Sequence, residues 1–266
     1  MPLTDRFDLV IFDWAGTMVD FGCRAPVLAL QDAFARRGVP ISEAEARADM
    51  GTAKADHVRA LLGLPRIAAA WTAARGAPPA QSDIDALVTD LGPLMRDQAT
   101  RVATLIDGAR ATFDSLRAAG VRVASSTGYT RDMMEPVLAA ADAQGYRPEH
   151  VICSGETPRG RPTPLMIYKA CAELGVWPLS RVVKVDDAEA GVAEGRAAGC
   201  YTVGLAASGN GMGLSADEYL ALPAAERETR LDASRARLLA AGADAVIDTV
   251  ADLVPLLARV AAGAPA

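Results

Sequence analysis

The chain has 266 residues, of which 51% are hydrophobic and 23% charged, with a formal net charge of −6. This length and composition allow one sizeable core and a smaller second domain. The sequence contains no basic run and no stretch of about 20 apolar residues, which argues against nucleic acid and membranes as partners.

Cysteine usage and the first residues both point to a reducing compartment. The four cysteines are scattered without a CxxC pair: Cys23, Cys153, Cys171 and Cys200. Such usage is typical of a reduced protein without a structural zinc site. Residues 1–8 carry two acids and no long apolar run, unlike a signal peptide. We therefore expect a cytoplasmic protein.

The segment 8–13 predicts a buried strand that ends on a carboxylate. Four apolar residues, 9–12, precede Asp13, and Gly16 follows in a tight turn. Ligands of α/β sheets bind at this end of a strand, so Asp13 is a candidate functional residue. Two residues later, Ala15 has no side chain that could act as an acid or base.

From about Gly22 to Arg101, helical periodicity replaces the strand pattern. One helix ends near Gly38, and a capping box at Ser42–Glu45 opens the next. Further helices are predicted over 52–62, 66–75 and 83–100. We expect residues 22–101 to form a helical cap domain, inserted into a core domain made of 1–21 and 102–266.

After residue 101, helix and strand patterns alternate. The predicted helices cover 109–119, a segment from about 131, 164–174 and 188–198. The predicted strands cover 121–126, 150–153, 181–186, 201–205 and 245–247. Repeated strand–helix units predict an α/β fold with a doubly wound parallel sheet and helices on both faces.

Polar residues follow several of these strands, where a parallel sheet brings distant residues together. Asp13 is suited to nucleophilic attack on phosphorus. The pair Asp186–Asp187 can hold a hard divalent ion such as Mg²⁺. Thr127 and the Gly128 backbone can bind phosphoryl oxygens at a helix N-terminus, where Thr127 can also be the N-cap. Arg161, between Gly160 and Pro162, is a fixed cation suited to the same oxygens.

This order of residues resembles the haloacid dehalogenase superfamily of phosphotransferases over essentially the whole chain. The resemblance implies that Asp13 is the nucleophile, Thr127 the phosphate-binding hydroxyl, Arg161 the basic residue and Asp187 the metal-binding acid. The chain departs from the superfamily pattern twice. Most phosphatases of this type carry a second aspartate where Ala15 stands, and many carry an acid near position 191, where this chain has Gly191.

Lysine is rare in this chain, with only Lys54, Lys169 and Lys184. Lys54 follows a Gly51 turn, in the predicted first turn of a helix, with His57 on the same face. The helix dipole and burial under a cap would lower the pKa of this amine and favour imine formation. An imine accepts the electrons released by P–C cleavage, so no acid at Ala15 is needed.

Here the resemblance narrows to the phosphonoacetaldehyde hydrolase family. The matching segments are 12–17, 50–57, 126–130, 160–162, and 203–205 leading into 208–210. The resemblance implies that Lys54 forms a Schiff base with phosphonoacetaldehyde and that Asp13 attacks phosphorus. Acetaldehyde then leaves as an enamine, and water hydrolyses the aspartyl phosphate, within 2-aminoethylphosphonate degradation.

The same resemblance implies the remaining site residues and partners. Mg²⁺ would be held by Asp13, Asp187 and the backbone carbonyl of Ala15. Residues near the imine and the substrate would be Cys23, Met50, Gly51, His57, Gly128 and Tyr129. Family members of this type form homodimers through the cap, which predicts a homodimer here.

Other interpretations remain open from the sequence. The chain can instead be a capped Mg²⁺-dependent phosphatase or phosphomutase acting on a small phosphorylated metabolite, or a catalytically silent binding protein. Lys54, His57 and Cys23 can each be ordinary helix or core residues. Asp186 can serve only to orient Asp187. Lys184, inside an apolar strand, can be an ion-pair partner or can reach the surface.

Overall fold

The computed structural model describes residues 2–264, whose core is a six-stranded parallel sheet in the order β3-β2-β1-β4-β5-β6. The strands are β1 (Leu9–Phe12), β2 (Arg122–Thr127), β3 (His150–Cys153), β4 (Val182–Asp186), β5 (Tyr201–Leu205) and β6 (Ala245–Ile247). In the register, Val10 lies between Val123 and Val183. The strand order reverses between β1 and β4, the position at which doubly wound sheets bind ligands.

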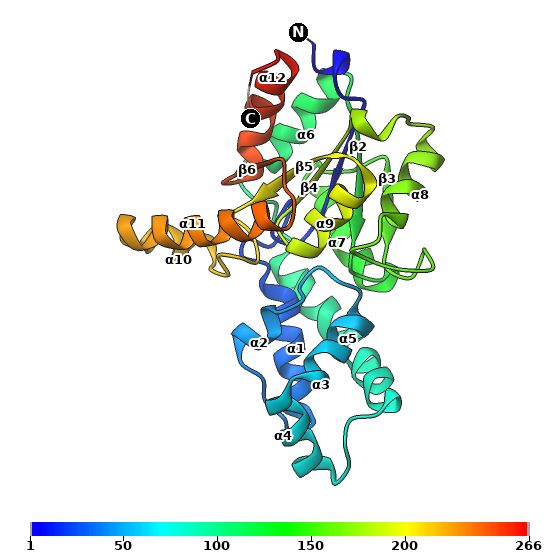
Figure 1. The fold of residues 1–266 in the computed structure, drawn as a ribbon, viewed down its shortest axis with the longest axis vertical. Coiled ribbons are helices and arrows are strands. Elements are labelled where there is room, and N and C mark those ends of the chain that lie inside the picture. The colour runs from blue at the N-terminus through cyan, green and yellow to red at the C-terminus, as the bar shows by residue number, and fades with distance from the viewer. Residues whose placement is uncertain (1, 265–266) are drawn as a thin grey trace.

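Helices cover both faces of this sheet (Figure 1). The chain order is α6 (Ala109–Ala118), α7 (Arg131–Ala143), α8 (Leu165–Leu174), α9 (Glu189–Ala198), α10 (Ala216–Ala221), α11 (Ala224–Ala240) and α12 (Leu253–Ala261). Side chains of a strand alternate between the faces. Val10 and Phe12 therefore pack in the cluster that includes α6, α7 and α12, whereas Leu9 and Ile11 pack against α8 and α9. Three short 3₁₀ helices are Leu3–Asp5, Leu179–Arg181 and Val250–Asp252.

Five helices between β1 and α6 form a unit at one end of the sheet (Figure 1). They are α1 (Arg24–Arg36), α2 (Glu43–Arg47), α3 (Lys54–Gly63), α4 (Pro65–Arg75) and α5 (Gln81–Val102). This unit has its own apolar interior, in which Phe34 of α1 meets Trp71 of α4 edge-on at 6.3 Å between ring centroids. The capping box of α2 forms as expected, since the Ser42 hydroxyl accepts from Glu45 N and the Glu45 carboxylate accepts from Ser42 N.

The predicted and observed elements differ mainly at their ends. The predicted bounds are confirmed for strands 150–153, 201–205 and 245–247. Helix α3 begins two residues later than expected, at Lys54. Helices α10 and α12 are not in the sequence prediction. In α10 a Ser215–Glu218 capping box compensates for a length of six residues. In α12 an apolar stripe carries the helix despite Pro255, which lies in its first turn.

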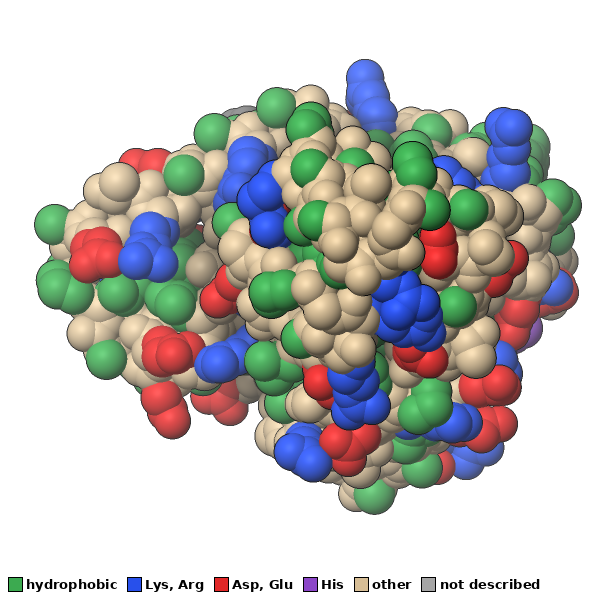
Figure 2. Space-filling model, turned by 90° about the horizontal axis from the view of Figure 1, so that it is seen from below, with side chains coloured by type: hydrophobic (Ala, Val, Ile, Leu, Met, Phe, Trp, Pro, Cys, Tyr) green, Lys and Arg blue, Asp and Glu red, His purple; other side chains and the backbone are tan. Residues whose placement is uncertain are grey.

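Two surface observations bear on partners. No helix within residues 2–264 is long and apolar enough to cross a membrane. On the face that Figure 2 shows, basic and acidic side chains are interspersed and form no extended patch of one sign. Among the described residues, several exposed charges form pairs one helical turn apart, such as Arg101 with Asp97. Such pairs contribute little to stability.

Candidate active site

The turn after β1 places Asp13 and then reverses the chain. The Asp13 N–H donates to the Val185 carbonyl at 3.0 Å, so the sheet ladder continues up to the candidate nucleophile. Gly16 follows with φ +82°, and a Cβ at this residue would lie 2.3 Å from Asp187 Oδ2. A glycine is therefore required both by the backbone conformation and by the closeness of the Asp187 carboxylate.

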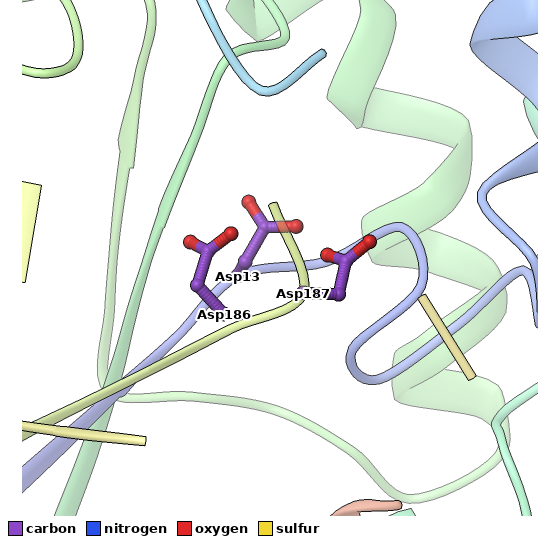
Figure 3. A group of neighbouring side chains, drawn as sticks. All are labelled: Asp13, Asp186 and Asp187. Atoms are coloured by element: carbon purple, nitrogen blue, oxygen red, sulfur yellow. The ribbon is translucent and has the colours of Figure 1, made fainter. Parts of the chain in front are cut away.

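Three buried carboxylates meet beyond the ends of β1 and β4. Figure 3 shows Asp13, Asp186 and Asp187 pointing to the same side, and one ligand atom from each lies within 4.8 Å of the others. Burial, with the negative charge of Asp186, raises the pKa of Asp13 to about 6. Burial, with the charges of Asp13 and Asp186, raises the pKa of Asp187 well above its ordinary value. Clustered oxygen donors with this excess of negative charge suit a hard divalent cation.

The Asp187 carboxylate is oriented by neighbouring loops. Thr17 Oγ1 donates to Oδ1 at 3.1 Å, and the backbone N–H of Asn210 donates to Oδ2 at 2.8 Å. Ser208 Oγ donates to the Gly16 carbonyl at 2.8 Å and ties the same loops together. Fixed orientation of a ligand by such neighbours is usual at metal sites.

Arg161 lies beside Asp13 and is almost wholly buried. Its Nη1 is 2.8 Å from Asp13 Oδ1. Its Nε donates to Glu194 Oε2 at 2.9 Å, and its Nη2 donates to the Ser126 carbonyl at 2.6 Å. The guanidinium therefore directs Nη1 toward Asp13, while Nε and Nη2 are held by the protein, an arrangement suited to binding an anion beside Asp13.

Lys54 reaches the same site from the helical unit. It is the first residue of α3, follows the Gly51 turn at φ +87°, and is only 3% exposed. Its Nζ lies 5.2 Å from the centroid of the Tyr129 ring. Burial lowers the pKa of Lys54 to about 8, with a further lowering by Arg161 that Cys23 and Asp13 oppose. Burial, one of the two causes expected from the sequence, is the largest cause of this lowering.

A small closed cavity joins these groups. Its lining is Asp13, Ala15, Cys23, Pro26, Met50, Gly51, Lys54, Thr127, Gly128, Tyr129, Arg161, Asp187 and Ala188. The cavity volume is about 20 Å³. This is enough for a water molecule but not for a substrate. A Cβ on Gly128 would lie 2.8 Å from the Thr52 carbonyl and 2.9 Å from that of Gly51. The 50–52 loop thus closes directly on Gly128.

His57, unlike the other residues predicted to lie near the imine and the substrate, does not line this cavity. Its ring is fully buried on α3, next to the backbone of Ala46 and Ala48. Burial, with the nearby charge of Lys54, lowers the pKa of His57 to about 3, so the ring is neutral. Any influence of His57 on the cavity is therefore exerted through Lys54.

The structure corrects one placement and adds residues that the sequence reasoning missed. Thr127 is the last residue of β2 and not a helix N-cap; that position belongs to Thr130. Thr127 Oγ1 instead accepts from Tyr129 N at 3.2 Å. Thr17 and Glu194 were missed. Thr17 follows the nucleophile turn and was open to detection, but Glu194 lies within a helix and carries no local signal.

Comparison with known proteins gives the family. A family model described as haloacid dehalogenase-like hydrolase matches residues 7–199. A curated phosphonoacetaldehyde hydrolase of Paraburkholderia phytofirmans is 44% identical, over 96% of this chain and 97% of the relative. One of Bacillus thuringiensis (strain Al Hakam) is 39% identical, over 96% and 97%.

A solved structure agrees with these relatives. The crystal structure of a phosphonoacetaldehyde hydrolase-like protein from Oleispira antarctica has a TM-score of 0.95 and 39% identity. It covers 98% of this chain and 96% of that one. The chain therefore belongs to the phosphonoacetaldehyde hydrolase family of the haloacid dehalogenase-like hydrolases.

Proposed function

We propose that this protein hydrolyses the C–P bond of phosphonoacetaldehyde to acetaldehyde and phosphate. One observation carries the proposal: a buried lysine of lowered pKa and a strand-end aspartate line the same closed cavity. The relatives named phosphonoacetaldehyde hydrolase support the substrate. Ala15 supports cleavage of a C–P bond. When an imine accepts the electron pair of the broken bond, the leaving group needs no acid at residue 15.

Catalysis begins at Lys54. Its neutral amine adds to the aldehyde carbon, and loss of water gives a protonated imine, which is one carbon away from the C–P bond. The closed cavity excludes bulk water and thereby favours the imine. Tyr129, whose ring faces the Lys54 ammonium, and Met50 and Cys23 shape this end of the cavity.

Asp13 then acts on the phosphorus atom. A carboxylate oxygen of Asp13 forms the new P–O bond while the P–C bond breaks, and the electron pair moves into the imine to give a neutral enamine. Arg161, Thr127 and the Gly128 N–H bind the phosphoryl oxygens and offset charge that develops on them. Water hydrolyses the aspartyl phosphate, and protonation and hydrolysis of the enamine release acetaldehyde and regenerate Lys54.

The carboxylate cluster fits Mg²⁺ as cofactor. Asp13 and Asp187, with the backbone carbonyl of Ala15, would hold the ion. Bound Mg²⁺ neutralises the carboxylates and phosphonate, which lets two anions approach one another. The raised pKa of Asp187 supports this assignment, because a nearby cation would restore the ionised form.

Residues 22–101 act as a cap domain over the core of 1–21 and 102–266, and two copies pair through their caps. The small volume of the closed cavity supports cap movement, because substrate needs an opening to enter. The neutral ring of His57 adds no positive charge next to Lys54.

Borohydride trapping tests the proposal. Acetaldehyde or phosphonoacetaldehyde with NaBH₄ should inactivate the enzyme and leave a mass increment on Lys54, which peptide mass spectrometry locates. A label on Lys169 or Lys184, or no label, would overturn the imine mechanism. Robust turnover of p-nitrophenyl phosphate with Mg²⁺, and none of phosphonoacetaldehyde, would favour a phosphatase instead.

A further inference from the structure

Helix α9 carries two glycines that face β4. A Cβ on Gly191 would lie 1.9 Å from Asp186 Oδ2 and 2.1 Å from its Cγ. A Cβ on Gly195, one turn later, would lie 2.8 Å from Lys184 Cβ. Glycine is less favourable than alanine inside a helix. The two glycines make the space that the β4 side chains of Lys184 and Asp186 occupy.

The Asp186 carboxylate accepts a hydrogen bond at Oδ1 and lies within ion-pair distance of two cations at Oδ2. Oδ1 accepts from the Ala188 N–H at 3.1 Å. Oδ2 lies 2.9 Å from Lys184 Nζ and 3.4 Å from Arg161 Nη2. Asp187, by contrast, is held by Thr17 and Asn210. Asp186 therefore contacts the buried cations, and Asp187 is oriented by other residues.

Lys184 and Arg161 meet the same two partners behind the site. Lys184 Nζ donates to Ser126 Oγ at 3.0 Å, and Arg161 Nη2 donates to that oxygen at 3.1 Å. Ser126 Oγ in turn donates to Glu194 Oε2 at 3.2 Å. That carboxylate oxygen also accepts from Arg161 Nε and lies 3.6 Å from Lys184 Nζ. Lys184, Asp186 and Glu194 are fully buried.

We propose that Asp186 is a positioning residue that, with Lys184 and Glu194, fixes Arg161 from behind so that Nη1 alone faces the phosphonate. The inference rests on the proposed function. When the phosphonate takes the place of Asp13 at Nη1, the contacts of Nε and Nη2 remain. The guanidinium therefore needs no reorganisation on binding substrate.

The packing also explains why the carboxylate comes from β4. The overlap of a Gly191 Cβ with Asp186 means that this space holds one side chain, from either the strand or the helix. An acid at residue 191 and an acid at residue 186 are thus alternatives for the same position, and this chain uses the strand.

An isosteric substitution separates positioning from metal binding. Asp186→Asn should weaken binding of inorganic phosphate, measured by calorimetry with Mg²⁺ present, and raise the KM for phosphonoacetaldehyde. The expected change is about tenfold, the scale of coupling within one ion-pair network. The Mg²⁺ concentration for half-maximal activity should stay unchanged. A raised Mg²⁺ requirement with unaltered phosphate binding would overturn the proposal and assign Asp186 to the metal.

Exchange of the two residues tests the shared space. Gly191→Ala should lower Tm in the wild-type background but not in Asp186→Gly. The double variant Asp186→Gly with Gly191→Asp should recover part of the phosphate affinity that Asp186→Gly loses. Gly92→Ala is the matched control, because this helical glycine has open space around its Cβ position and should not lower Tm. Equal Tm losses for Gly191→Ala in both backgrounds would contradict the shared-space argument.

These readouts stay interpretable if the substrate is another compound. Phosphate affinity and Tm depend on the Arg161 site and not on the imine. Wild-type protein that binds phosphate but does not cleave phosphonoacetaldehyde would reject the proposed function alone. Unchanged phosphate affinity in Asp186→Asn, with cleavage intact in the wild type, would reject the positioning role alone.

Discussion

The cavity lies between the core domain and the helical unit, and buried charged groups on these two sides, the core wall and the cap wall, differ in their partners. On the core wall, Arg161, Lys184 and Asp186 are buried and paired with one another. On the cap side, Lys54 and, behind it, His57 are equally buried, but within residues 2–264 no carboxylate pairs with Lys54.

This difference matches the chemistry proposed for each wall. The paired groups hold one another in fixed positions, which suits the binding of a phosphonate. An unpaired buried amine has its pKa lowered by desolvation, which suits attack on a carbonyl. The contrast teaches that burial alone does not decide what a lysine can do: Lys184 and Lys54 are both buried, but only Lys184 lies within 2.9 Å of a carboxylate, that of Asp186.

Removing one reactive group at a time distinguishes the role of the cap wall from that of the core wall. Lys54→Arg keeps a positive charge but cannot form an imine, and Asp13→Asn cannot form the acyl phosphate. Each should lower phosphonoacetaldehyde turnover by about 10⁴-fold or more, measured as phosphate release. Only Lys54→Arg should also abolish borohydride trapping.

Circular dichroism spectra matching the wild type are the control for both variants. Near-normal turnover in Lys54→Arg would show that the cap wall has no chemical role. Lost trapping in Asp13→Asn would show that the walls do not act independently.

The pH dependence of trapping measures how far desolvation has altered Lys54. Its pKa is about 8 against an ordinary 10.5, and only the neutral amine attacks. The rate of acetaldehyde-dependent inactivation with cyanoborohydride should therefore rise about tenfold per pH unit well below pH 8, roughly 50-fold between pH 6 and 8, and level off above pH 9. A midpoint near 10.5 would mean that the amine is as hydrated as a surface lysine.

Gly128 is the point where the walls touch, so a side chain there should keep them apart. Gly128→Ala puts a Cβ 2.8 Å from the Thr52 carbonyl, and backbone atoms cannot yield cheaply. We expect trapping at Lys54 to fall by about tenfold, while phosphate affinity at the core wall changes less. An equal loss in both assays would show that the residue serves the core wall.

Arg47 joins the cap to the core outside the cavity, and its loss should have the smallest effect. Its Nη1 donates to the Gly22 carbonyl at 3.0 Å and to Asn210 Oδ1 at 3.2 Å, and Nη2 donates to the Gly213 carbonyl at 2.9 Å. Arg47→Ala should raise KM by about threefold through weaker closure, with kcat little changed. Arg101→Ala, which removes an exposed pair on α5, is the matched control.

Much of the fold and of the cavity lining follows from local patterns. Alternating strand and helix signals placed β1 to β6, and residues such as Asp13, Lys54 and Arg161 stood out because each follows a strand or a glycine turn. The structure brings these residues to one cavity. His57 was placed on the same helix face as Lys54, yet packing puts its ring behind the lysine and away from the lining.

The sequence by itself therefore determined the element order, the helical insertion and the residues that can react, because periodicity and turn chemistry are local properties. Only the tertiary structure decided what surrounds each of them. For Lys184 the sequence left open an ion pair or a path to the surface. The structure shows ion pairs, and its partners Ser126, Asp186 and Glu194 come from two strands and a helix. Contacts between such separate segments depend on how helix α9 lies against β4, which no local pattern specifies.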